Sequence, residues 1–326
     1  MRVTAIDYMR NFLFLQIILL VYCSGIWADG PKSEPILPLS ANEQLNPKLV
    51  ALGDQLFHDK RLSQDNSISC ASCHVLSSGG TDKMPRSIGV GGAVGPIKAP
   101  TVYNSSYNLT QFWDGRSETL ESQASGPVHN VLEMNSTWME VISKLSSDPA
   151  MVERFSELFA DGITGENITI AIAAFERSLV TINSRFDLWL RGEGVLNEEE
   201  IRGYRLFKSY GCISCHQGAN VGGNMYAYMG AMGDYFIDRN SEITEADYGR
   251  FNVTGNEEDK HYFKVPSLRL AYINAPYFHD GSAQGLDDAV RIMGRYQLGR
   301  EIPDHHIADI VAFLHTLVGE HARFKP

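Results

Sequence analysis

Two short stretches carry the residues with the clearest chemistry: Cys-Ala-Ser-Cys-His at 70–74 and Cys-Ile-Ser-Cys-His at 212–216. In c-type haem proteins, two thiols at this spacing form thioethers with the porphyrin, and the histidine that follows ligates the iron. The same cysteine spacing also builds zinc sites and dithiol redox centres, but those sites give the histidines no role. We therefore expect two covalently bound c-type haems, held by Cys70, Cys73 and His74 and by Cys212, Cys215 and His216.

The sequence around the two motifs repeats at matching offsets. A Gly-x-x-Leu-Phe segment precedes each motif, at 53–57 and at 203–207. Downstream, Ala-Pro-Thr at 99–101 corresponds to Val-Pro-Ser at 265–267, and Trp-Asp-Gly at 113–115 corresponds to His-Asp-Gly at 279–281. Agreement at so many offsets predicts an internal duplication, that is, two tandem cytochrome c-like haem domains. We place the domains at 29–190 and 191–326.

The elements that must position these motifs are helices. Leucines at 45, 49, 52 and 56 form one stripe of a helix that ends before the first motif. Asn197, with Glu200 three residues later, is typical of a helix start, and this helix runs to Phe207. Longer helices are predicted over 165–190 and 303–318, with few strand-like segments elsewhere. The predicted fold is mainly α.

The two repeats differ at the position where a second iron ligand would stand. Met293 lies seven residues beyond Leu286, and a thioether opposite an imidazole is a common axial ligand that raises a haem potential. Pro127 lies seven residues beyond Leu120 and cannot bind iron. The first haem is therefore predicted to be open on one side. Gln123 and Glu133 follow nearby, and a carboxylate there can move a proton during O–O cleavage.

The N-terminus and the charge limit the location and the partners. Arg2 and Arg10 precede a short apolar run at 12–22, and the small Ala28 follows this run. This pattern predicts a signal peptide over 1–28, with an uncleaved membrane anchor as the alternative. The segment 1–28 also contains Cys23, the one cysteine of the five that lies outside the two motifs. The formal net charge of −11 argues against a nucleic-acid partner.

Seven segments distributed from about residue 45 to residue 318 resemble the bacterial dihaem cytochrome c peroxidases, a group that also contains the MauG-type oxidases. Among them are "LGDQLFHDKRLSQDNSISCASCH", "APTVYNSSYNLTQFWDGR" and "APYFHDGSAQGLDDAVRIMG". The resemblance implies a periplasmic enzyme that reduces hydrogen peroxide with electrons from a small c-type cytochrome or a cupredoxin, and it allows a homodimer. It assigns Gln123 and Glu133 to peroxide, Trp113 to electron transfer between the haems, and His279 to the surroundings of the second haem.

The sequence departs from this family at two positions. Members typically carry a histidine that caps the peroxidatic iron in the oxidised enzyme, whereas this chain has Val90 there, and no histidine stands between His74 and His129. The family also uses an asparagine side chain for an interdomain calcium, and Lys98 stands at that place. An ammonium cannot coordinate a cation, so the lysine argues against calcium and could act as a counter-charge instead.

Two other functions fit parts of this pattern. A MauG-type oxidase would use the open haem to modify a partner protein, but such proteins generally have a tyrosine where Met293 stands. A non-enzymatic dihaem electron carrier would need neither an open haem nor Glu133. A peroxidase accounts for all of these residues.

Overall fold

The computed structural model of the protein describes residues 34–41 and 44–324. The predicted signal peptide and Cys23 lie outside the described residues. Helices and turns dominate, and the regular strands of the described chain form one two-stranded sheet. The prediction of a mainly α fold is confirmed. In the described part of the chain, no helix has the length and apolar character needed to cross a membrane.

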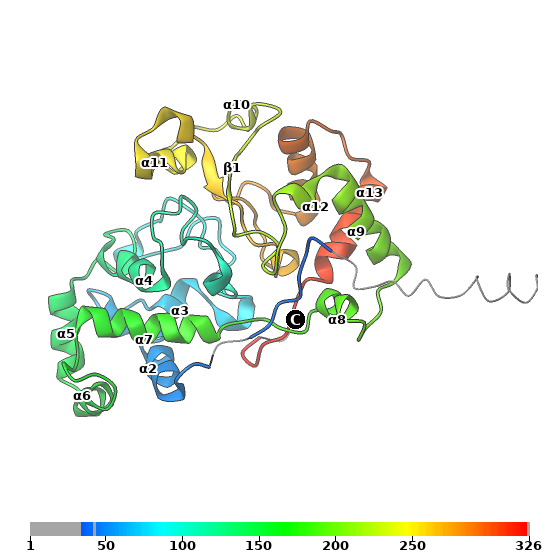
Figure 1. Ribbon diagram of the computed structural model, residues 1–326. Helices are drawn as coiled ribbons and strands as arrows, with labels where there is room; N and C mark the ends of the chain where they lie inside the picture. Colours follow the sequence, from blue (N-terminus) through cyan, green and yellow to red (C-terminus); the bar gives the residue numbers. More distant parts are fainter. Residues whose placement is uncertain (1–33, 42–43, 325–326) are drawn as a thin grey trace, which may run out of the picture. The chain divides into compact units, whose positions relative to one another are not determined.

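The helices fall into two sets along the chain (Figure 1). The first set comprises α2 (Pro47–Phe57), α3 (Cys70–Cys73), α4 (Leu120–His129), α5 (Trp138–Ser146), α6 (Pro149–Ser156) and α7 (Gly165–Ser178). The second set comprises α8 (Arg185–Leu190), α9 (Glu198–Tyr210), α10 (Tyr235–Asp238), α11 (Phe251–Thr254), α12 (Leu286–Ile292), the π-helical turn Met293–Gln297 and α13 (Asp304–His315). Strands β1 (Tyr226–Tyr228) and β2 (Tyr262–Lys264) pair antiparallel.

Two of the predicted helices begin at capping side chains, and the first of them begins after Leu45, which the predicted stripe had included. Asn46 precedes α2, and its side-chain oxygen accepts a hydrogen bond from the Lys48 amide at 3.0 Å. Asn197 and Glu200 form a reciprocal capping box at the start of α9, in which each side chain accepts a hydrogen bond from the other residue's amide at 2.9 Å. Capping boxes satisfy amides that the first turn leaves free. The predicted start of α9 is confirmed.

The prediction of one continuous helix over 165–190 is wrong. α7 ends at Ser178, and α8 begins only at Arg185. Between them the chain is extended, and Ile182 exchanges two backbone hydrogen bonds with Glu320, at 3.1 and 2.7 Å. The Ser184 hydroxyl then accepts from the Asp187 amide and starts a new helix. The predicted helix over 303–318 is also shorter, because α13 occupies only 304–315.

Each set contains one tight crossing of two helices. A Cβ on Gly53 of α2 would lie 1.8 Å from the carbonyl oxygen of Ala171 on α7. A Cβ on Gly203 of α9 would likewise lie 1.8 Å from the carbonyl oxygen of Asp309 on α13. Both contacts require glycine, since no side chain fits between the backbones. The α2–α7 crossing belongs to one large hydrophobic core, and the α9–α13 crossing belongs to another.

Candidate active site

The first Cys-x-x-Cys-His motif forms a single helical turn beside a cavity. α3 holds both cysteines, and His74 follows directly as the C-cap residue. His74 Nδ1 lies 3.3 Å from the Gly80 carbonyl oxygen, so the tautomer with its proton on Nδ1 donates to this carbonyl. Burial lowers the pKa of His74. The ring is therefore neutral with an unprotonated Nε2, which is the form that ligates a metal.

The second motif presents its histidine in a similar way. Residues Cys212–Ser214 form a 3₁₀ turn, and burial lowers the pKa of His216 to about 4. Its Nδ1 is buried and has no hydrogen-bond partner among the described residues. A Cβ on Gly222 would lie 2.3 Å from the Pro266 carbonyl oxygen and 3.3 Å from this Nδ1, so backbone packs against that edge of the ring. Nε2 is the nitrogen left to meet a ligand.

The two motifs line two different cavities. The first cavity has a volume of about 150 Å³ and is lined by Cys70, Cys73 and His74. The second has a volume of about 280 Å³ and is lined by Cys212, Cys215 and His216. None of the four motif cysteines forms a disulfide with another described residue, and burial raises the pKa of each thiol. The thiols therefore do not converge on one zinc ion, whereas a neutral imidazole and two thiols in each apolar cavity fit a covalently attached haem.

The first cavity also contains the residues predicted to handle peroxide. Gln123 of α4 and Glu133 both line it, and Pro127 lies in the same wall. Burial raises the pKa of Glu133, although its Oε1 accepts a hydrogen bond from Asn130 Nδ2 at 2.7 Å. A buried carboxylate with a raised pKa is a stronger base than an exposed one, so it can take up a proton from a bound substrate. The cavity holds a further buried carboxyl that the sequence analysis did not single out, Glu176 of α7.

The second cavity contains the predicted methionine ligand. Met293 begins the π-helical turn that continues α12, and its side chain lines the cavity together with His216. The repeat therefore leads to a methionine and a histidine in one cavity. A second methionine, Met229, lines the same cavity and has no counterpart in the sequence analysis. The wall of the second cavity therefore offers two thioethers, those of Met293 and Met229.

The loop that carries Val90 covers one side of the first cavity. Its neighbours Ile88 and Gly89 line the cavity. Val90 itself is half-buried and does not belong to the part of the described chain that lines this cavity. The Val90 amide donates to the Glu133 carbonyl oxygen at 2.8 Å, which ties this loop to the segment that follows α4. Among the described residues, His74 is the one imidazole in this lining.

A reciprocal pair of hydrogen bonds joins the segments between the cavities. The Lys98 amide donates to the His279 carbonyl oxygen at 2.8 Å, and the Lys264 amide donates to the Trp113 carbonyl oxygen at 2.9 Å. Lys98 corresponds to Lys264 in the sequence repeat, and Trp113 corresponds to His279. The sequence repeat therefore maps each of these two hydrogen bonds onto the other. We call this pair of hydrogen bonds the clasp.

Trp113 lies at the clasp and lines both cavities. Its Nε1 donates to the Lys98 carbonyl oxygen at 3.0 Å. The indole meets the His279 ring edge-on, with centroids 6.4 Å apart and an interplanar angle of 69°. Its position between the cavities is compatible with the predicted electron relay.

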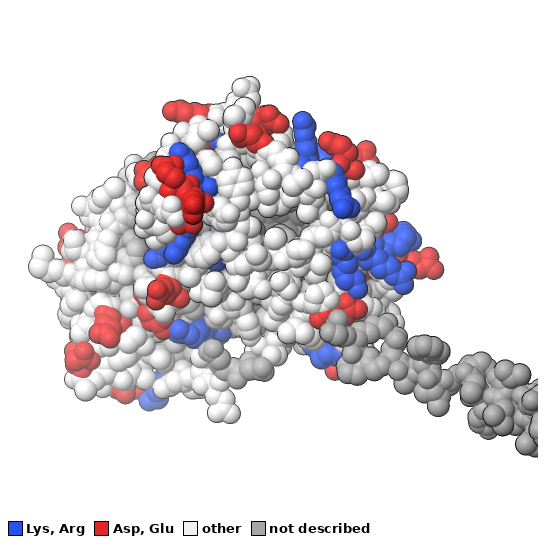
Figure 2. All heavy atoms as spheres, turned by 45° about the horizontal axis from the view of Figure 1, so that its top comes forward, with Lys and Arg blue, Asp and Glu red and all other residues white. Residues whose placement is uncertain are grey.

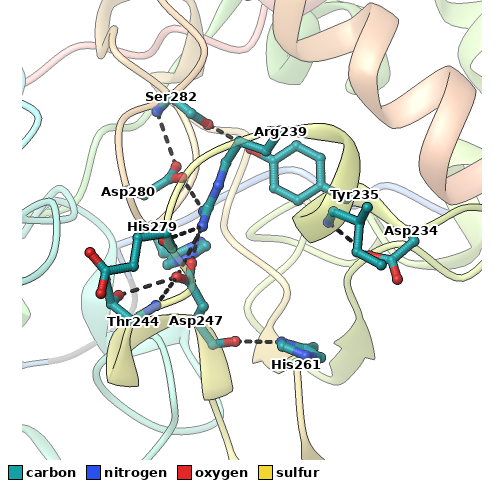
Figure 3. Close-up of polar contacts among 11 residues, drawn as sticks. Asp234, Tyr235, Arg239, Thr244, Asp247, His261, His279, Asp280 and Ser282 are labelled. Atoms are coloured by element: carbon teal, nitrogen blue, oxygen red, sulfur yellow. Dashed lines mark hydrogen bonds and ion pairs between the residues drawn. The ribbon is translucent and has the colours of Figure 1, made fainter.

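A buried charged cluster fixes His279 in the wall of the second cavity (Figure 3). His279 Nε2 lies 2.7 Å from Asp247 Oδ1, and the ring stacks on Phe263. The Arg239 guanidinium donates to Asp247 and to Asp280, at 2.8 and 2.5 Å. Burial alone would raise the pKa of Asp247, but the hydrogen bonds from His279 and Arg239 hold it well below its usual range. Arg239 supplies the cation for this acidic cluster.

Lys98 is buried at the clasp, with an exposed fraction of 4%. Its Nζ lies 3.3 Å from Thr81 Oγ1 and 3.3 Å from the Ala99 carbonyl oxygen. Burial lowers the pKa of Lys98 to about 8. The ammonium thus has oxygen partners of the kind that a cation would bind.

Comparisons with known proteins agree with this arrangement. Residues 47–194 match the family model described as di-haem cytochrome c peroxidase. The chain is 50% identical over 300 residues to the cytochrome c peroxidase Ccp of Escherichia coli, which covers 91% of this chain and 64% of that relative. It is 48% identical over 317 residues to the cytochrome c551 peroxidase of Nitrosomonas europaea, which covers 97% of this chain and 92% of that relative.

A solved structure supports the fold independently. The crystal structure of a MauG-like protein associated with microbial copper homeostasis superposes with a TM-score of 0.76 and 28% sequence identity. The match covers 91% of this chain and 96% of that one. The similarity therefore extends over most of the chain.

Proposed function

The chain belongs to the family of bacterial di-haem cytochrome c peroxidases and is an enzyme of that class, and we propose that it reduces hydrogen peroxide at the first cavity. Electrons enter through the second cavity. One observation carries this division of roles: Met293 lines the second cavity where the repeat places Pro127 in the first. The first cavity, whose lining also includes Met134, holds Gln123 and Glu133 instead. The first haem remains open to peroxide in the oxidised enzyme, because Val90 replaces a capping histidine.

Two c-type haems supply one-electron redox chemistry and, at the first site, a place where peroxide binds. Cys70 and Cys73 hold the first haem by thioethers, and Cys212 and Cys215 hold the second. His74 and His216 ligate through Nε2, and Met293 provides the sulfur ligand of the second site. The neutral state of both imidazoles supports these assignments.

Peroxide reduction consumes two electrons and two protons and yields two waters. The Glu133 carboxylate takes a proton from one peroxide oxygen and returns it to the other, which leaves as water when the O–O bond breaks. The Gln123 amide donates a hydrogen bond that orients the substrate. The buried position of Glu133 supports this role, since a desolvated carboxyl holds its proton more tightly than an exposed one.

The electrons come one at a time from a small c-type cytochrome or a cupredoxin. They pass from the second cavity to the first by way of Trp113, which touches both. On the face shown in Figure 2, acidic and basic side chains lie beside one another.

We also propose that the chain arose by internal duplication, with domains over 29–190 and 191–326 after a signal peptide over 1–28 that directs it to the periplasm. The clasp supports the duplication, since its two hydrogen bonds are exchanged by the sequence repeat. The paired glycine crossings support it as well. Lys98 replaces an interdomain calcium, so that the holoenzyme needs no added calcium.

Steady-state peroxide consumption tests the proposed function. The purified dihaem protein should consume hydrogen peroxide only when a reduced small cytochrome or cupredoxin is supplied, and a calcium chelator should leave the rate unchanged. Oxidation of a partner protein without donor turnover would instead identify a MauG-type oxidase. Donor oxidation that does not depend on peroxide would identify an electron carrier.

A further inference from the structure

The two helix crossings allow the two cavities to be compared position by position. A Cβ built on Gly53 would lie 1.8 Å from the Ala171 carbonyl oxygen and 2.8 Å from Phe175 Cβ, both on α7. A Cβ built on Gly203 would lie 1.8 Å from the Asp309 carbonyl oxygen and 2.9 Å from Phe313 Cβ, both on α13. Ala171 therefore corresponds to Asp309, and Phe175 corresponds to Phe313. The two helices are in a fixed register.

This register reveals a difference between the cavities. Ile172 lines the first cavity, and Ile310 lines the second at the same helical position. One turn later, Glu176 lines the first cavity, and Leu314 lines the second. A carboxyl thus stands in the first cavity at a position where the second cavity has an aliphatic side chain.

The surroundings of Glu176 disfavour its charged form. The residue has an exposed fraction of 6%, and burial raises the pKa of its carboxyl to about 8. The attraction of Arg177 opposes this shift only in part, and the repulsion of Glu121 adds to it. Arg177 also donates to Glu121, with Nη1 2.6 Å from Oε1. A carboxyl that burial holds neutral in one cavity, at a position that is aliphatic in the other, can change its protonation state with the charge of its cavity.

We propose that Glu176 is a proton-exchanging residue of the first cavity, which releases its proton when the haem held there is oxidised and regains it on reduction. This inference rests on the proposed binding of haem to Cys70 and Cys73. On oxidation one electron leaves the haem, and one proton leaves the carboxyl for solvent. The donor's electron and a solvent proton restore both, so charge in the cavity stays balanced. Leu314 cannot perform this exchange in the second cavity.

The physical reason is electrostatic. An oxidised haem carries one more positive charge, which favours the carboxylate form of Glu176, whereas the reduced haem favours the neutral acid. The haem potential must therefore fall as pH rises through the range in which Glu176 titrates. Other titratable or charged groups lie on the elements around it: Arg177 on α7, Glu121 on α4, Asp54 and His58 on α2, and Cys70, Cys73, His74, Lys98, Arg116 and Glu133 around the cavity.

The test is an optical redox titration of both haems at several pH values. Wild-type protein is compared with Glu176→Gln, which keeps the shape, and with Glu176→Leu, which installs the residue of the second cavity. Glu118→Gln is the matched control, since it removes an exposed carboxyl just before α4 that does not line the cavity. In the wild type, the ferric-to-ferrous ratio of the first haem at a fixed applied potential should change by up to tenfold per pH unit around pH 8. This change corresponds to a shift of about 59 mV per pH unit in the reduction potential of a one-electron couple.

Both Glu176 variants should lose this dependence, while Glu118→Gln keeps it and the second haem is unaffected throughout. A first haem whose potential keeps the same slope in both Glu176 variants would overturn the inference while leaving the peroxidase function intact. If the isolated protein contains only one haem, held at the second motif, both the proposed function and this inference are wrong, because both require a haem at the first motif.

Discussion

Glu133 is the residue whose burial and proposed chemistry are most closely linked. Glu133→Gln keeps the shape of the side chain but cannot exchange a proton, so the reaction with peroxide should slow by about two to four orders of magnitude while both haems remain bound. Glu118→Gln, on an exposed carboxyl just before α4, should react normally. Stopped-flow mixing with peroxide measures both rates. Near-normal turnover of the Glu133 variant would remove this residue from the mechanism.

The pH dependence of the wild-type enzyme follows from the same residue. Glu133 must be ionised to accept the first proton, and burial raises its pKa. The rate should therefore fall on acidification at a higher pH than an ordinary glutamate would give. Glu133→Gln should lack this acid limb.

Met293 and Met229 both line the second cavity, and only the repeat selects between them. Met293→Ala should remove the optical signature of histidine and methionine ligation and lower the potential, because a thioether favours the ferrous state. Met229→Ala is the matched control and should leave the spectrum unchanged. The reverse result would move the ligand to Met229 and show that the repeat-based alignment is wrong there.

Motif residues were predictable because the chemistry fixes their spacing. The two thiols and the histidine of each motif are adjacent in sequence, so a short pattern contains the site. The cluster around His279 was not predictable in this way. Asp247 lies in a 3₁₀ turn and Arg239 caps the end of α10, both far from His279 along the chain, and the three pair only in the folded protein. Glu176 could have been found by aligning it with Leu314, but the helix register that justifies the alignment becomes visible only in three dimensions.

Helix crossings set the distance between the elements that form each cavity. At Gly53, a methyl group would lie far inside van der Waals contact with the Ala171 carbonyl, so Gly53→Ala must separate α2 from α7. Overpacking of this kind costs about 1–3 kcal/mol or more. Gly95→Ala is a suitable control, because its Cβ would come no closer than 3.4 Å to the Ser87 carbonyl oxygen. Denaturant unfolding should show a lower free energy only for Gly53→Ala, and equal effects would contradict the crossing.

Helix existence was predictable from periodic leucines, whereas helix ends depended on tertiary partners. The apolar pattern continues past Ser178, yet the chain there leaves the helix to pair Ile182 with Glu320 near the C-terminus. No local residue signals that partner. The π-helical turn at Met293 is a similar case, because the repeat identifies Met293 as a candidate ligand but does not indicate the backbone conformation there.

The loop that contains Val90 decides whether the first haem is open at rest. With an aliphatic residue there, the fully oxidised protein should show one high-spin and one low-spin ferric haem and react with peroxide without prior reduction. Val90→His should convert part of the high-spin signal to low-spin. Val94→His, at an exposed position of the same loop, should not. Two low-spin haems in the electron paramagnetic resonance spectrum of the oxidised wild type would contradict this prediction.

At the scale of the whole molecule, the two equivalent hydrogen bonds of the clasp connect the two cavities. Trp113 lies at the clasp, and its indole, which carries a polar N–H group, lines both cavities. Trp113→Phe retains a ring but loses the hydrogen bond from Nε1 to the Lys98 carbonyl. We expect electron transfer between the haems to slow more than the initial reaction with peroxide, because only the first process crosses the clasp.

Rapid mixing of peroxide with protein whose second haem has been reduced separates the two steps by wavelength. Phe112 also lines both cavities, so Phe112→Leu tests whether any change in this wall has the same effect. In that control both steps should stay close to wild type, since Phe112 has no side-chain hydrogen bond to the clasp. If Trp113→Phe slows both steps equally, the indole supports packing, and the electron must take another route between the cavities.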